Sequence, residues 1–319
     1  MMQKIKNAGQ KLHGVFHKFS QSKATLWLRL GFLLAVGVYL YLEITKIGWA
    51  EVIAALPANP AFYLVFIVIY LALPLFEVVI YQRLWKRPLW RYTPFFLRKQ
   101  VYNAALIGYS GEAVFCFWAQ NKLGLPSRTA LMAIKDNNIL SAMASNGATI
   151  LLVLAFIGTG QISWLNTSGN STGLYIGFGI GFTLLSSMAV YYFRKKLIAM
   201  PGKDAAIVLS IHVFRVFAVM LLQALQWSIV IPNAPFSVWL AFLTAQFLLT
   251  RIPFLPNKDL MFLGLSLSLG GMIDAPSAVV AGMFLASGAL MQAANLVVFL
   301  ATSLTENVTK AVKPEETVA

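Results

Sequence analysis

Five ionisable side chains lie within or beside apolar stretches of the chain, where charges are least expected. They are two carboxylates and three cations: Glu112, Arg215, Arg251, Lys258 and Asp259. Placing each charge in hydrocarbon costs on the order of 2.5–3.5 kcal/mol, so these residues are functional candidates by default. The set suits a phosphate diester, because guanidinium groups bind the phosphate while the carboxylates neutralise the empty site. The alternative is structural pairing, for example of Glu112 with Arg215.

Histidine and the remaining polar residues offer less specific chemistry. His212 and Arg215 share a helix face. Two acids and this histidine could relay protons, but a polar role near the membrane interface is the plainer interpretation. Asp136 is predicted to cap the helix that follows it. His13 and His17 have the spacing of metal ligands but no third ligand nearby, and we predict no metal, no cofactor and no catalytic residue.

The composition indicates what must hold these charges in place. Of 319 residues, 59% are hydrophobic and 11% charged, and the mean hydropathy is +0.72. A soluble domain has about 25% charged residues. The apolar residues form continuous blocks of roughly 18–25, the length that crosses about 30 Å of hydrocarbon as a helix. The sequence therefore predicts an all-α polytopic membrane protein.

Six blocks are predicted to cross the membrane fully, and two are not. The six crossings are 26–45, 61–81, 138–158, 173–193, 206–231 and 277–303. The regions 101–118 and 238–272 are interrupted, the first by glycines and Glu112, the second by prolines and three charges. Irregular backbone and charged side chains at membrane depth are tolerated only inside protein or beside a water-filled cavity. We therefore predict that both regions are re-entrant broken helices.

The basic residues predict the orientation. The net charge is +14, and the cations flank the apolar blocks without forming an aromatic-interleaved patch, so no nucleic-acid partner is predicted. Segments 1–23 and 194–203 are rich in basic residues, as is 82–99, which carries Arg83, Lys86, Arg87, Arg91, Arg98 and Lys99. Segments 159–172 and 232–237 have no basic residue. The positive-inside rule then places both termini in the cytoplasm, with the chain in the cytoplasmic (inner) membrane.

The predicted elements repeat with inverted orientation. Two spans, a re-entrant element and a third span occur twice, in a first half at 24–160 and a second half at 161–303. Glu112 and Asp259 occupy corresponding positions in the two re-entrant elements. An inverted repeat with broken helices is typical of transporters that bind substrate near the bilayer midplane. An amphipathic segment, 1–23, and a cytoplasmic tail, 304–319, flank the two halves.

One known family shares these features. Asn103, followed by Gly108-Tyr109-Ser110-Gly111-Glu112, resembles the Asn…Pro-x-Arg-x-Gly-Glu signature of the lysylphosphatidylglycerol synthase transmembrane, or flippase-like, family. Tyr109-Ser110 replaces the basic residue of that signature. The segment 253–264 lies where the family carries Pro-x-x-Gly-Gly-x-Gly-x-x-Glu, but Asn257-Lys258-Asp259 replaces its glycines and glutamate. The resemblance adds Asn103 and Tyr109 to the candidate residues.

The resemblance implies translocation of a phospholipid or lipid-linked headgroup between leaflets. In the aminoacyl-lipid synthases of this family a soluble transferase domain follows the membrane part, and we expect that enzymatic activity to be missing from this chain. Two alternatives remain open. The same charges could serve an ion-coupled carrier of a small anionic solute, and a less favoured alternative is an intramembrane lipid-modifying enzyme.

Overall fold

The structure is a computed structural model, and it describes most of the second, third, fourth, fifth and sixth predicted crossings. The described residues are 56–105, 110–160, 169–252 and 277–311, together with Val38, Phe262 and Ser266. Several predictions fall elsewhere. The span 26–45, the amphipathic segment 1–23, the end of the tail and the candidates Tyr109, Lys258 and Asp259 lie outside the described residues.

All regular elements of the described residues are helices. They are α4 (Pro60–Trp85), the 3-10 turn η1 (Trp90–Tyr92), α5 (Thr93–Ala105), α6 (Ser110–Leu123), α7 (Ser127–Gly158), α9 (Gly169–Leu197), α10 (Gly202–Val230), α11 (Phe236–Arg251) and α13 (Ser277–Ala311). Asn59 begins α4 by accepting the backbone N–H of Ala61, ahead of a proline in the first turn. Lys86 ends the same helix in the left-handed conformation, with φ 51°.

Four of these helices are long and apolar enough to cross a membrane, namely α4, α7, α10 and the part of α13 from Gly282 to Ser303. They correspond to four of the six predicted crossings. A fifth prediction, 173–193, coincides with α9, a helix of 29 residues. Large apolar side chains such as Leu185, Met188 and Leu221 point outward and are 66–73% exposed. An exposed apolar surface of this kind is compatible with a membrane protein.

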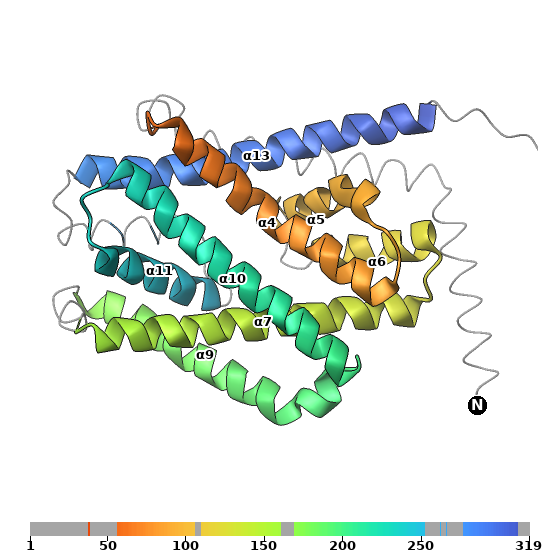
Figure 1. Ribbon diagram of the computed structural model, residues 1–319, viewed down its shortest axis with the longest axis horizontal. Helices are drawn as coiled ribbons and strands as arrows, with labels where there is room; N and C mark the ends of the chain where they lie inside the picture. Colours follow the sequence, from red (N-terminus) through yellow and green to blue (C-terminus); the bar gives the residue numbers. More distant parts are fainter. Residues whose placement is uncertain are drawn as a thin grey trace, which may run out of the picture.

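The helices form an elongated bundle, and most basic residues of the described part of the chain gather at one end. In Figure 1 this is the right-hand end, where α4 and α9 finish and α7 and α10 begin. Arg83, Lys122 and Arg194 lie near the ends of α4, α6 and α9, while Arg128 and Lys203 lie in the first turns of α7 and α10. The segment that joins α10 to α11 lies at the opposite end and carries no basic residue.

The first predicted re-entrant region is a helical hairpin. The region 101–118 is divided between α5, which ends at Ala105, and α6, which begins at Ser110. These helices have 13 and 14 residues. Each is about 20 Å long, which is too short to cross the hydrocarbon layer. Figure 1 shows that α5 runs from the basic end toward the middle of the bundle and that α6 runs back toward the basic end.

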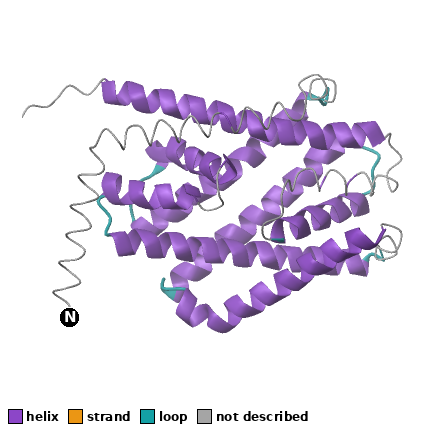
Figure 2. Ribbon diagram, turned by 180° about the vertical axis from the view of Figure 1, so that it is seen from behind, coloured by secondary structure: helices purple, strands orange, loops and turns teal. Residues whose placement is uncertain are grey.

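The second interrupted region begins with a short helix that enters from the other end. α11 has 16 residues and ends at Arg251, where Ile252 adopts an extended conformation. Its last residues lie near the middle of the bundle, and the view from behind in Figure 2 shows the same arrangement. The rest of the region 238–272 lies almost entirely outside the described residues.

Candidate functional site

Three charged residues on three helices meet inside the bundle. The ammonium of Lys99 on α5 lies 2.5 Å from Oε1 of Glu77 on α4 and 3.2 Å from Oε1 of Glu112 on α6. The side chains of Lys99 and Glu77 are 2% and 8% exposed. The rings of Phe115 and Tyr81 lie 5.3 and 5.9 Å from the ammonium. This triad therefore sits in an aromatic enclosure with little access to water.

The end of α5 and the beginning of α6 pack together beside the same triad. Asn103 donates its side-chain amide to Oε1 of Glu112 at 3.1 Å and accepts the backbone N–H of Gly111 at 2.8 Å. A Cβ atom at Gly111 would lie 2.3 Å from the carbonyl oxygen of Lys99. Only glycine therefore lets α6 approach α5 this closely. The other carboxylate oxygen of Glu112, Oε2, is buried without a hydrogen bond to any described residue.

A second polar group joins α7 to α10. His212 is 1% exposed, and its Nε2 lies 2.9 Å from Oδ1 of Asn137. One turn further along α10, Arg215 donates to the hydroxyl of Ser141 at 3.2 Å. Phe214, the residue before Arg215, packs against Phe76, the residue before Glu77, at 5.9 Å between ring centroids, so this group borders the triad. Two acids, one lysine and one arginine thus give the combined cluster no net charge.

Arg251 takes part in a separate polar connection. It donates to Oδ1 of Asn146 on α7 at 3.3 Å, and Asn146 donates in turn to Ser186 and Ser187 of α9 at 3.0 and 3.2 Å. Asn146 and Ser141 are five residues apart and therefore point in different directions from α7. The two arginines consequently contact different faces of that helix.

The structure thus brings together only part of the predicted site. Glu112 and Asn103 lie in one cluster, and Arg215 borders it. Glu112 does form an ion pair, as the structural alternative expected, but its partner is Lys99 and not Arg215, which was the example given. Among the described residues, no three histidine, cysteine, aspartate or glutamate side chains lie together as metal ligands would.

Two other sequence interpretations need correction. Arg98 and Lys99 were assigned to a cytoplasmic loop, but both are buried in α5, at 5% and 2% exposure. Asp136 does not cap a helix, because α7 begins nine residues earlier, at Ser127. Its carboxylate accepts the backbone N–H groups of Ala199 and Met200 at 2.9 and 2.7 Å. A tertiary contact therefore satisfies this acid within the helix.

The triad contains two residues that the sequence interpretation missed. Glu77 lies within the apolar run of the predicted span 61–81. That position was the available signal, because it indicates a sixth charge at membrane depth. Lys99 lies four residues before Asn103 and so shares its helix face, which was the available signal for its burial.

Comparison of the chain with protein-family models, with curated proteins and with solved structures finds no match in any of the three. The family resemblance therefore rests on the sequence motifs alone.

Proposed function

We propose that this protein is a lipid transporter that moves an anionic phospholipid or lipid-linked headgroup between the leaflets of the cytoplasmic membrane. The observation that carries the proposal is the buried triad of Glu77, Lys99 and Glu112 at the interior of an apolar helical bundle. Buried charges are costly and a hydrophobic replacement is often at least as stable, so stability alone is a weak reason for such a cluster.

The packing of the helices supports the inverted repeat on which the proposal depends. If α4, α5 and α7 correspond to α10, α11 and α13, the contacts of α5 should have counterparts among those of α11. α5 packs on α4 as α11 packs on α10, and α5 packs on α13 as α11 packs on α7.

The orientation follows from the basic end. In our proposal this end faces the cytoplasm, so that the hairpin enters the membrane from inside and α11 enters from outside. Both elements then end near the bilayer midplane, where half-helices of transporters commonly hold their substrates. The six crossings and the cytoplasmic termini belong to the same proposal.

The empty cluster is neutral, and this suits an anionic substrate. A headgroup phosphate can replace a carboxylate beside Lys99 or Arg215 and keep its charge-assisted hydrogen bonds. Glu77 and Glu112 hold the Lys99 ammonium in place. Asn103 contributes a neutral donor beside Glu112. Exchange of one anion for another avoids leaving a buried cation without a partner, which is the expensive state.

An ion-coupled carrier of a small anionic solute is the second candidate. It is favoured by the contact of both Glu77 and Glu112 with the single ammonium of Lys99. Two carboxylates contact one ammonium, so a proton can bind one acid while the other retains the ion pair. Such a carrier would respond to a pH gradient and take up a soluble anion. A lipid transporter instead moves a membrane-bound headgroup.

Leaflet transfer of a fluorescent anionic phospholipid in proteoliposomes tests the proposal. We expect the wild-type chain to expose the inner-leaflet probe to an impermeant quencher faster than empty vesicles do. Arg215→Ala should slow this transfer by about tenfold or more, because a charged hydrogen bond contributes about 1.5–3 kcal/mol. Lys122→Ala, an exposed change at the basic end, is the matched control.

Each outcome of this assay separates the candidates. Transfer equal to that of empty vesicles, together with pH-driven uptake of a soluble anion, would favour the carrier. Equal transfer by wild type and by an Arg215→Ala/Arg251→Ala variant would show that these arginines are structural. Arg215→Lys, which keeps the charge, should retain more transfer than Arg215→Ala if the charge itself acts on the substrate.

A further inference from the structure

A small cavity of about 110 Å³ lies between four helices, toward the end of the bundle opposite the basic residues. Its described walls come from the first halves of α4 and α13, the last turns of α10, the second half of α11, and Phe262. Ile69 of this wall and Glu77 of the triad are eight residues apart on α4, about 12 Å along the helix axis. The cavity is therefore separate from the buried triad.

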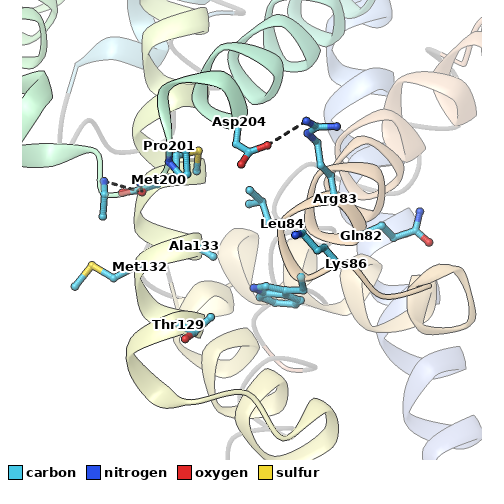
Figure 3. A pocket seen from close by; sticks show the side chains of 13 residues that line it. Gln82, Arg83, Leu84, Lys86, Thr129, Met132, Ala133, Met200, Pro201 and Asp204 are labelled. Atoms are coloured by element: carbon cyan, nitrogen blue, oxygen red, sulfur yellow. Dashed lines mark hydrogen bonds and ion pairs between the residues drawn. The ribbon is translucent and has the colours of Figure 1, made fainter.

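A larger cavity of about 650 Å³ at the basic end has a different character. Figure 3 shows Asp204 facing Arg83 there, and the two side chains pair at 3.1 Å. Asp136 of the same cavity accepts two backbone N–H groups. Both carboxylates are therefore satisfied by the protein itself.

Three glutamines give the small cavity its polar character. Gln226 on α10 is 1% exposed and is held by the protein, because it donates to the carbonyl oxygen of Phe62 at 3.2 Å and accepts from Gln223 at 2.9 Å. Gln246 on α11 makes no hydrogen bond with any described residue, and its amide remains accessible from the cavity. An amide without partners in an apolar interior costs free energy. Gln246 is therefore better suited to a ligand than to the fold.

The small cavity offers several hydrogen-bond acceptors and no charge. Oε1 of Gln223 accepts from no described residue, and the hydroxyl of Ser287 donates its proton to the carbonyl oxygen of Met283. These two oxygens and Oε1 of Gln246 can each accept a hydrogen bond from a ligand. None of the described lining residues is charged, so a phosphate would lack a cation and an ammonium would lack an anion. A hydroxyl group, which is neutral and both donates and accepts, fits this set.

Aromatic rings form much of the remaining wall. The ring centroids of Phe262 and Phe284 lie 4.8 Å apart, and those of Trp227 and Phe284 lie 5.5 Å apart. Such apolar surface favours contact with C–H groups over contact with water. At about 30 Å³ for each water molecule, the cavity has room for roughly three or four waters, a space that a three-carbon polyol also fills.

From these features we infer that the small cavity binds an uncharged polyol, whose hydroxyl groups pair with Gln223, Gln246 and Ser287 and whose C–H groups lie against the aromatic rings. The occupant is a free three-carbon polyol or the glycerol end of an uncharged lipid, since both carry the same hydroxyl groups. This inference goes beyond the proposed transport of an anionic headgroup, because the cavity has no charged described residue and lies apart from the triad.

The test is saturation-transfer NMR of glycerol with the purified full chain, in an amine oxide detergent that has no hydroxyl groups to compete. We expect saturable binding, in the millimolar range that suits so small a molecule. Gln246→Leu keeps most of the bulk and removes the amide, so it should weaken binding about three- to tenfold. Because this change breaks no hydrogen bond to a described residue, the melting temperature should stay close to that of the wild type. Gln120→Leu, on α6 and outside the cavity, is the control.

Gly288→Leu tests the site by filling it. A Cβ atom at Gly288 would meet nothing within 4 Å, so there is room for a larger side chain in this wall. We expect glycerol binding to weaken about tenfold or more. Gly147→Leu should leave binding unchanged, because Gly147 has the same free space but lies on α7, outside the cavity. Binding that neither Gln246→Leu nor Gly288→Leu weakens would overturn the site, as would the absence of saturable binding, which would leave the cavity to water alone.

Two further probes identify the occupant by their displacement of glycerol. Monohexanoyl glycerol that displaces it at roughly tenfold lower concentration than free glycerol would indicate the uncharged lipid, and equal or weaker displacement would indicate the free polyol. Ethylene glycol has one hydroxyl group fewer and should bind about threefold or more weakly. Displacement by ethylene glycol at the same concentration as glycerol would contradict the hydroxyl pairing. None of these measurements requires leaflet transfer, so their outcome is independent of the transport proposal.

Discussion

Lys99 and Glu77 lie 22 positions apart in the chain, yet their charged atoms are 2.5 Å apart in the interior of the bundle. The contact fastens the hairpin to α4, because Lys99 belongs to α5. Glu112 of α6 contacts the same ammonium, so one cation holds three helices. Its removal therefore affects the fold and the proposed site together.

Lys99→Met should destabilise the protein more than Glu77→Gln. The lysine change leaves two buried carboxylates without their cation, whereas Glu77→Gln leaves the pair of Lys99 and Glu112 intact. Breaking a buried pair from one side costs about 3–5 kcal/mol. Thermal unfolding in detergent, followed by fluorescence-detected size exclusion, measures the order of the two variants. A higher melting temperature for Lys99→Met than for Glu77→Gln would contradict the triad geometry.

Gly111→Ala should loosen the hairpin. The added methyl would lie 2.3 Å from the Lys99 carbonyl oxygen and 2.7 Å from Oδ1 of Asn103, so α5 and α6 must separate. We expect a loss of about 1–3 kcal/mol, as for other overpacked sites. Gly147→Ala is the control, because nothing lies within 4 Å of its added methyl, and it should be neutral or slightly stabilising. Equal melting temperatures for both variants would argue against the close approach.

Asp136→Asn should weaken the attachment of α7 to the segment that joins α9 to α10. The carboxylate holds the N–H groups of Ala199 and Met200, and an amide oxygen is a weaker acceptor without charge. We expect a cost of about 1–3 kcal/mol for this buried acid. Faster tryptic cleavage after Lys196 or Lys203 would report the loosening. Cleavage at the wild-type rate would mean that these hydrogen bonds contribute little.

Cysteine labelling should place the two ends of the bundle on opposite sides of the membrane. In a Cys116→Ser background, Lys122→Cys at the basic end should react with an impermeant maleimide only after the cytoplasmic side is exposed. Thr159→Cys, at the far end of α7, should react from outside. Reaction of both positions from one side would exclude the proposed orientation.

The helical class and most of the long helices could be predicted from the sequence, because apolar length is a local property. The division of the region 101–118 between the separate helices α5 and α6 was also predictable, from its glycines. The beginning of α7 was not. Ser127–Lys135 is too polar for a span, and Asp136 resembled a cap because its partners, Ala199 and Met200, are distant in the chain. A local pattern cannot distinguish a cap from a tertiary contact.

The site was only partly predictable for a related reason. Glu112 and Asn103 were recognised because they lie close in sequence within one motif. The burial of Lys99 depends on Glu77, which reaches it from a preceding helix, whereas the charge rule treats every cation near a span end alike. The sequence places Arg251 with the other charges because all of them are expected at membrane depth. In the structure its side chain instead donates to Asn146 of α7.

The spacing of residues along α10 has a mechanical consequence. Asp204, Val208, His212 and Arg215 follow at intervals of four, four and three residues, so they lie along one side of a rigid rod. Any rotation of that rod about its axis displaces all four in the same sense. The ion pair of Asp204 with Arg83, the apolar packing of Val208 and the polar contacts of His212 and Arg215 therefore change together whenever α10 rotates.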